Sequence, residues 1–167
     1  TITRQAKAEA DFRSEASTHF NMRYEGEMAT PKLRQEILLT LERHFDDLVS
    51  TMGLLPRDPI IVVLYTNQTY FDVTLAPAWT AALNDGKLRI PVEGLTGVTP
   101  ELSRVLKHEL AHSFIRQATN GRCPVWLNEG FAQLVEPKSA ARYRMQLAKL
   151  FDDGKQAPLQ ALEGSFI

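Results

Sequence analysis

The chain has 167 residues, of which 44% are hydrophobic and 23% are charged, proportions that exclude general disorder and a fibrous architecture. Its 19 basic and 20 acidic residues give a formal net charge of -1, so there is no electrostatic reason to expect nucleic acid as a partner. The longest apolar runs are too short to span a bilayer, and the single cysteine, Cys123, permits neither an internal disulfide nor a thiolate metal cluster.

No internal repeat or long linker divides the chain, so residues 1–167 are expected to form one domain. The sequence starts at Thr1 rather than at a methionine, which is compatible with the removal of a leader or of a further domain.

The first part of the chain is expected to form two strands, a long helix and a buried strand. Apolar residues alternate partially over 11–17 and 18–25, which predicts a pair of strands or a hairpin. A Thr-Pro pair at 30–31 is a typical helix start, and Gly53 supplies the end of the apolar periodicity that follows. The β-branched run over 60–65 predicts a buried central strand.

Two shorter elements are expected next. Thr66 or Asn67 is suited to cap a short helix that continues through Phe71. Residues 87–91 alternate polar and apolar side chains and end in proline, which cannot donate a hydrogen bond to a ladder. This segment therefore predicts an edge strand.

The last part of the chain is expected to be helical. A second Thr-Pro pair at 99–100 opens a long helix that ends near Asn120. Further helices are predicted from Pro124 to 135 or 136, and over 139–151. The fold class is therefore α+β, with a small, mostly antiparallel sheet and helices packed on it.

The second long helix contains the sequence HELAH at residues 108–112. His108 and His112 are four residues apart, so one helical turn brings both imidazole rings to the same face. Zinc accepts neutral histidine nitrogens at about 2.0–2.1 Å, and such a pair presets two corners of its tetrahedron. Glu109 lies beside the metal rather than on it, where its carboxylate can take a proton from a zinc-bound water. The alternative is a pair of surface histidines, which the apolar character of this helix disfavours.

A catalytic zinc site needs a third protein ligand. Glu129 follows His112 by 17 positions, which is enough for the end of the helix, a turn at Gly121 and the start of a returning helix. We therefore expect Glu129 to be the third ligand of one zinc ion per chain. The remaining histidines, His19 and His44, belong to distant elements and are expected to be structural.

The two motifs resemble a known family. HELAH followed by WLNEGFA is similar to the gluzincin metallopeptidases, and residues 128–136 resemble the zinc-ligand helix of the M1 aminopeptidases. The order of elements over 11–136 is more similar to the bacterial peptidase MA-like domains, which are often attached to tetratricopeptide repeats. The resemblance implies a zincin-like fold, with the edge strand beside the active-site helix and a helical segment after it. It also implies a zinc-dependent peptidase.

Carried over to this chain, the resemblance implies His108, His112 and Glu129 as zinc ligands and Glu109 as the catalytic base. Asn128 is expected beside the ligand set. Many gluzincins carry an acidic residue four positions after the ligand glutamate to orient a zinc histidine, and here Gln133 stands at that position.

The family also has residues that stabilise the oxyanion and that bind the substrate's amino terminus, and this chain offers only weak candidates for these two roles. The oxyanion donor is usually a tyrosine or histidine after the ligand glutamate, and only Tyr143 is available, although packing in an amphipathic helix explains it equally well. The M1 segment whose glutamate holds the substrate's amino terminus is missing; Glu93 is the one substitute, and a solvated loop carboxylate is the alternative.

The expected edge strand suggests how a substrate binds. An unpaired ladder at Leu88, Arg89 and Ile90 can bind an extended peptide by strand addition, with the scissile carbonyl over the metal. Outward-facing Lys87 and Arg89 are equally consistent with protection of the edge against aggregation. Because no free terminus is needed, cleavage is expected to be endopeptidase-like or specific to one protein.

Three functions remain open at this point, of which a structural or storage zinc site is the third. The first is a zinc-dependent peptidase acting on a peptide or protein. The second is a non-catalytic zincin-like module that recognises a protein or cell-wall partner. The intact Glu109 favours the first, because a structural zinc needs no base beside it. The resemblance also favours a bacterial protein in the periplasm or another extracytoplasmic compartment, with its leader removed.

Overall fold

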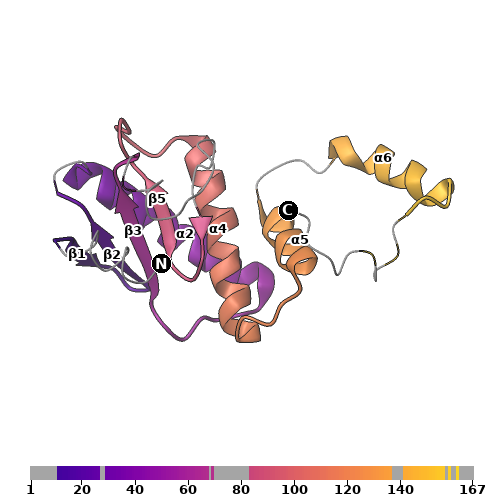
Figure 1. Ribbon diagram of the computed structural model, residues 1–167, viewed down its shortest axis with the longest axis horizontal. Helices are drawn as coiled ribbons and strands as arrows, with labels where there is room; N and C mark the ends of the chain where they lie inside the picture. Colours follow the sequence, from indigo (N-terminus) through magenta and orange to yellow (C-terminus); the bar gives the residue numbers. More distant parts are fainter. Residues whose placement is uncertain are drawn as a thin grey trace.

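A computed structural model describes residues 11–26, 29–67, 69, 83–136, 141–156, 158 and 161. The fold is α+β, as predicted (Figure 1). The elements in chain order are β1 (Arg13–Ala16), β2 (Phe20–Tyr24), α2 (Pro31–Met52), β3 (Ile60–Tyr65), β4 (Leu83–Asn84), β5 (Leu88–Pro91), α4 (Pro100–Thr119), α5 (Val125–Val135) and α6 (Ala141–Asp152).

The two long helices begin and end as the sequence predicts. The Thr30 hydroxyl accepts a hydrogen bond from the backbone N–H of Leu33 at 3.2 Å, and Gly53 ends α2 in the left-handed conformation with φ 64°. Thr99 caps α4 in the same way through Leu102 at 3.1 Å. Both starts also carry proline at the first helical turn, where its missing N–H costs nothing.

The sheet is mixed, so the prediction of a mostly antiparallel sheet is wrong. Its strand order is β1-β2-β3-β5-β4. The pairs β1–β2 and β4–β5 are antiparallel, whereas β2–β3 and β3–β5 are parallel. For β2 and β3 the reason is the connection: α2 lies between them, and a crossover through a helix returns the chain in the same direction.

β5 is not the edge strand that the sequence predicts. The two-residue strand β4 pairs with it, placing Leu83 opposite Arg89 and Asn84 opposite Leu88. Leu88 and Ile90 face the core and are fully buried. The edge at this end of the described sheet is therefore β4, which is too short to show a strand pattern in the sequence.

Arg89 is also not an outward-facing side chain. It is 2% exposed, its Nε donates to Asp85 Oδ1 at 2.9 Å, and its Nη1 donates to the Tyr65 hydroxyl. The alternation of polar and apolar residues along 87–91 correctly assigns Leu88 and Ile90 to one face of the strand and Arg89 to the other. It does not reveal that Arg89 is also buried. The predicted substrate-binding role of Leu88, Arg89 and Ile90 depended on an exposed edge, whereas Leu88 and Arg89 are paired with β4.

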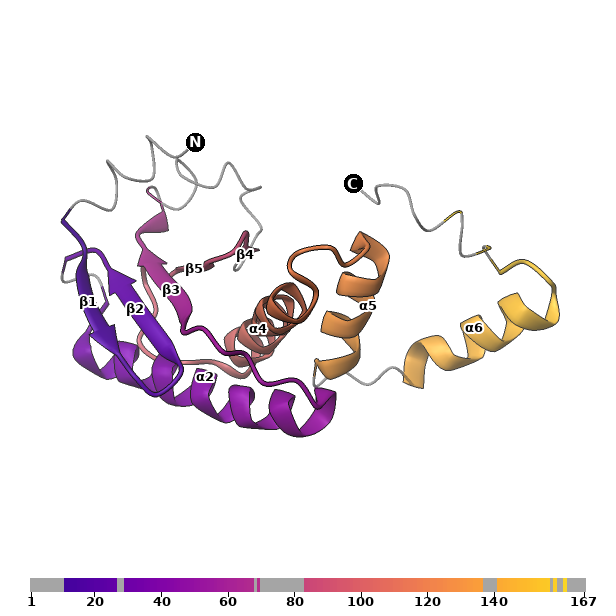
Figure 2. The same ribbon diagram turned by 90° about the horizontal axis from the view of Figure 1, so that it is seen from below.

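One face of the sheet forms the core against α2 and α4. Figure 2 shows α2 running beneath the strands, with α4 beside it, α5 next to α4 and α6 projecting from the body. The side chains that fill this layer come from alternate strand positions and from the inner faces of the helices. They include Phe20, Met22, Val62, Leu64, Leu88, Ile90, Leu33, Ile37, Leu41, Phe45, Leu106, Leu110 and Phe114.

Two predicted segments are described only in part. The Thr66 hydroxyl accepts a hydrogen bond from the backbone N–H of Thr69 at 3.2 Å, as a helix cap does, but the rest of that short helix lies outside the described residues. α6 ends one residue after the predicted range 139–151. The first two residues of that range, 139 and 140, lie outside the described part of the chain. In the described part of the chain, no helix has the length and apolarity that a membrane span requires.

Candidate metal centre

The candidate site lies between α4 and α5, which form a helical hairpin. α4 ends at Asn120, which adopts a left-handed conformation with φ 50°, and Gly121 follows with φ 71°. These two residues reverse the chain, and α5 begins after Pro124 and returns alongside α4. The returning helix brings Glu129 back to the histidine face, as the spacing predicts.

The carboxylate of Glu129 faces the Nε2 atom of each histidine. Its Oε2 lies 3.6 Å from His108 Nε2, and its Oε1 lies 3.5 Å from His112 Nε2. Two ligands that each lie about 2.0–2.1 Å from a tetrahedral ion are separated by about 3.4 Å. Each histidine nitrogen therefore lies at about ligand–ligand spacing from a carboxylate oxygen of Glu129.

The other ring nitrogen of each histidine lies close to a protein oxygen. Asn128 Oδ1 lies 2.9 Å from His112 Nδ1, and Glu136 Oε1 lies 2.6 Å from His108 Nδ1. An oxygen at Nδ1 favours the tautomer with its proton there, which leaves the Nε2 lone pair available. Both rings thus present a free lone pair toward Glu129.

Glu136 is itself fixed by a cation. Its carboxylate side chain is 5% exposed, and Arg104 Nη1 donates to Glu136 Oε2 at 2.6 Å. Arg104 also pairs with Glu101 on the outer side of α4. These contacts raise the pKa of Arg104 above its ordinary value, chiefly through the hydrogen bond to Glu101, so the guanidinium remains charged.

Glu109 lies beside the two histidines. One ligand atom from each of His108, Glu109 and His112 can be chosen so that all three lie within 4.8 Å of one another, and this cluster could hold a metal ion. Burial, followed by the nearby charge of Glu129, raises the pKa of Glu109 to about 8. Without a cation, the carboxyl is therefore mostly protonated at neutral pH.

His108 is an uncharged ligand candidate. Burial, and next the neighbouring charge of His112, lower the pKa of His108 below its ordinary value. A neutral imidazole is the form that binds a metal, so the environment already favours the ligand state.

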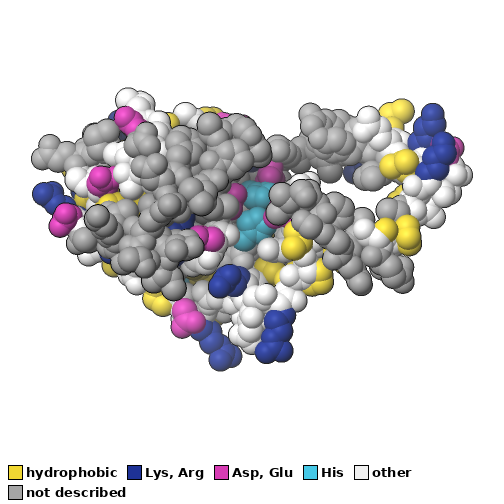
Figure 3. Space-filling view, in the orientation of Figure 1, with side chains coloured by type: hydrophobic (Ala, Val, Ile, Leu, Met, Phe, Trp, Pro, Cys, Tyr) yellow, Lys and Arg dark blue, Asp and Glu magenta, His cyan; other side chains and the backbone are white. Residues whose placement is uncertain are grey.

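Figure 3 shows histidine side chains, in cyan, in a hollow between the sheet side of the molecule and α5, with acidic side chains next to them. The histidine side chains of the cluster are 16% and 11% exposed, and that of Glu129 is 48% exposed. The site is thus set into the surface but open on one side, as a site that admits a substrate must be.

The remaining histidines make contacts elsewhere. His19 Nδ1 lies 2.6 Å from Glu42 Oε2, and His44 Nε2 lies 2.9 Å from the Ser103 carbonyl oxygen. Glu93 Oε2 accepts a hydrogen bond from the backbone N–H of Asn67 at 3.0 Å. The structure does not bring these three into the cluster.

Sequence reasoning did not find Glu136 or Arg104. It placed the partner of a zinc histidine at Gln133, which is exposed on α5, whereas the observed partner of His108 stands three residues later. A signal was present: Glu136 is seven positions after Glu129, about two helical turns, and so lies on the same face. Tyr143 lies in α6, where its side chain is outside the described part.

Comparison of the chain with protein-family models, with curated proteins and with solved structures finds no match.

Proposed function

We propose that this protein is a zinc-dependent peptidase in which His108, His112 and Glu129 hold the metal and Glu109 is the general base. The observation that carries the proposal is the convergence of both Nε2 atoms on the two oxygens of Glu129, at 3.6 and 3.5 Å. A hydrogen bond or ion pair alone needs only one such contact. Two parallel contacts of this length fit a shared ion better.

The donor set favours zinc among the common metals. Two neutral imidazoles and one carboxylate suit zinc, whereas magnesium and calcium prefer oxygen ligands alone. Three protein ligands leave one position of a tetrahedron open, as catalytic zinc sites require. A bound zinc ion supplies Lewis acidity, which polarises a carbonyl and lowers the pKa of a water at the site.

Glu109 is suited to move the proton of the reaction. A buried carboxylate whose pKa is raised to about 8 is a stronger base than an exposed one once it is ionised. A nearby dication favours the ionised form, which counteracts the effect of burial. Glu109 then accepts a proton from the attacking water and donates it to the leaving amine.

The HELAH and WLNEGFA motifs and the helical hairpin that joins them support a gluzincin with a zincin-like fold. The mode of cleavage we propose is endopeptidase-like, or specific to one protein. An aminopeptidase needs a carboxylate for the substrate's ammonium group, and the carboxylate of Glu93 instead accepts a hydrogen bond from the backbone of Asn67. Equal or faster cleavage of peptides with blocked amino ends is the expected result, whereas a requirement for a free end would contradict this mode.

The test of the function is metal analysis together with a peptide-cleavage assay on the wild type and on Glu109→Gln. We expect one equivalent of zinc in both proteins, because Glu109 is not a ligand, and loss of cleavage by about 1,000-fold or more in the variant. The matched control is Glu101→Gln, on the same helix but on its exposed side. One equivalent of zinc without Glu109-dependent cleavage would instead support a non-catalytic binding module.

A further inference from the structure

Arg116 is a cation close to the candidate site that the proposed mechanism does not use. It lies four residues after His112 on α4, so both side chains are on the same face of the helix. Arg34, Arg89 and Arg104 each pair with a carboxylate. In contrast, the exposed guanidinium of Arg116 has no hydrogen-bond or ion-pair partner within the described residues.

The turn between β4 and β5 lies against this guanidinium. Asn84 Nδ2 donates to the Glu109 carbonyl oxygen at 2.7 Å and to Ser113 Oγ at 2.6 Å, which ties the turn to α4. Asn84 Oδ1 accepts from the backbone N–H of Gly86 at 3.0 Å. A Cβ atom at Gly86 would lie 3.4 Å from Arg116 Cζ, so the guanidinium lies flat against a glycine.

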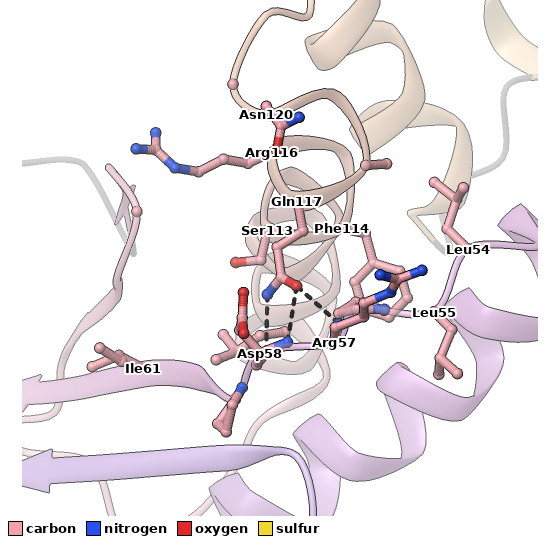
Figure 4. A pocket seen from close by; sticks show the side chains of 16 residues that line it. Leu54, Leu55, Arg57, Asp58, Ile61, Ser113, Phe114, Arg116, Gln117 and Asn120 are labelled. Atoms are coloured by element: carbon pink, nitrogen blue, oxygen red, sulfur yellow. Dashed lines mark hydrogen bonds between the residues drawn. The ribbon is translucent and has the colours of Figure 1, made fainter.

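Arg116 and one of the proposed metal ligands, His112, line one small cavity. This cavity has a volume of about 90 Å³ and is lined by polar side chains that include His112, Asn128, Asn84 and Arg116. Arg116 also borders a larger cavity of about 830 Å³ on the other side of the C-terminal turns of α4. Figure 4 shows its side chain extending away from Arg57 and Asp58, which line that larger cavity. Arg116 therefore borders both cavities.

The spacing limits what such a cation can bind. Four residues of helix rise by about 6 Å, and one residue of an extended chain covers about 3.3–3.6 Å. Along the helix, the separation of His112 and Arg116 is therefore about the length of two residues of an extended chain. Guanidinium groups bind carboxylates in particular, through two parallel hydrogen bonds.

We propose that Arg116 recognises a carboxylate on the substrate, within about two residues of the scissile bond. This inference rests on the proposed function. The carboxylate is either the C-terminus of a short leaving peptide or the side chain of an acidic residue. Both have the same chemistry, and the experiment separates them.

The test uses binding, with the zinc-loaded protein and dipeptide ligands whose amino end carries a succinyl hydroxamate as the metal-binding group. One pair of ligands ends in Leu-Ala with a free carboxylate or with an amide. A second pair, both amidated, ends in Leu-Asp or Leu-Asn. Affinities are measured by calorimetry for the wild type, for Arg116→Gln and for the control Arg122→Gln, which removes a nearby exposed arginine that does not border the small cavity.

We expect the wild type to bind one charged ligand about fivefold more tightly than its neutral counterpart, a modest ratio because the cation is exposed. The ratio should fall to one in Arg116→Gln and persist in Arg122→Gln. Preference for the free acid identifies a C-terminal carboxylate, and preference for Leu-Asp identifies an acidic side chain. Equal affinities within both pairs, or a ratio unchanged in Arg116→Gln, would overturn the proposal while leaving the metal site intact. Absence of zinc and of hydroxamate binding in the wild type would overturn both proposals.

Discussion

Two histidine–glutamate contacts in the described part of the chain have the same length, but only one belongs to the candidate metal centre. His19 Nδ1 lies 2.6 Å from Glu42, and His108 Nδ1 lies 2.6 Å from Glu136. The ring of His19 stacks on Phe45 with its centroid 3.8 Å away. The ring of His108 instead directs its second nitrogen toward Glu129.

This comparison shows that a carboxylate at one ring nitrogen does not define a metal site. Glu42 accepts hydrogen bonds from the Ser17 hydroxyl and from the ring and the backbone N–H of His19, so it joins the start of β2 to α2. Such a contact is structural. The candidate centre differs because Glu129 lies near the second ring nitrogen of His108 and near the same nitrogen of His112. Two helices must pack together to bring these side chains close to one another.

The largest difference between the two regions should appear in metal content. His112→Ala is expected to abolish stoichiometric zinc binding, because one of three protein ligands is lost. His19→Ala should retain one equivalent, since its ring contacts Glu42 and Phe45. Metal analysis after dialysis measures both, and equal zinc content in the wild type and His112→Ala would refute the ligand assignment.

The third ligand should have the next largest effect. Glu129→Ala is expected to weaken zinc binding by about 100-fold or more, because the remaining histidines supply only two ligands and no negative charge. Gln133→Ala is the control, one turn further along α5 and exposed. Competition with a chelator gives the affinities. A variant of Glu129 that binds zinc like the wild type would mean that Glu109 is the third ligand instead.

Loss of the carboxylate beside the His108 ring should reduce zinc affinity less than loss of a ligand does. Glu136→Gln keeps an oxygen near His108 but removes its charge, and we expect zinc affinity to fall by about 10- to 100-fold. Glu101→Gln also removes a carboxylate from Arg104 but none from His108, so it should leave the affinity unchanged. An equal loss in both variants would assign the effect to Arg104 rather than to the histidine contact.

The smallest effect is expected at the structural pair and concerns stability. Burial by itself would raise the pKa of Glu42, but the hydrogen bonds from Ser17 and His19 outweigh it and lower the pKa below its ordinary value. Since the folded state binds this proton less tightly than the unfolded state, the stabilisation is present at neutral pH and is lost as the pH falls below about 4.5.

Glu42→Gln should therefore lower the free energy of unfolding by about 1 kcal/mol at pH 7. The difference from the wild type should diminish in acid, and zinc binding should not change. Asp46→Asn, an exposed change on the same helix, is the control in denaturant titrations at several pH values. A difference between Glu42→Gln and the wild type that stays constant down to pH 3 would contradict the expectation.

Local signals predicted the parts of the structure that depend on neighbours in the chain. Caps and apolar periodicity located α2 and α4, and the spacing of His108, His112 and Glu129 predicted the cluster, because all three lie on one helical hairpin. Strand pairing depends on distant segments, so the sequence alone did not establish the parallel pairs or the cover of β5 by β4. The burial of Arg89 was missed for the same reason, since its partner Tyr65 is on another strand.

Few buried side chains attach α5 to the rest of the protein, and this affects which helix unfolds locally. Among the residues of α5, only Ala132 and Val135 are buried, which is little apolar contact to hold a helix in place. α4, in contrast, contributes much of the core. On the proposed function, the metal links the two helices, so its removal leaves α5 free to undergo local unfolding while α4 stays folded. Backbone amides of α5 should then exchange with deuterium much faster in the metal-free protein, and those in the middle of α4 should not.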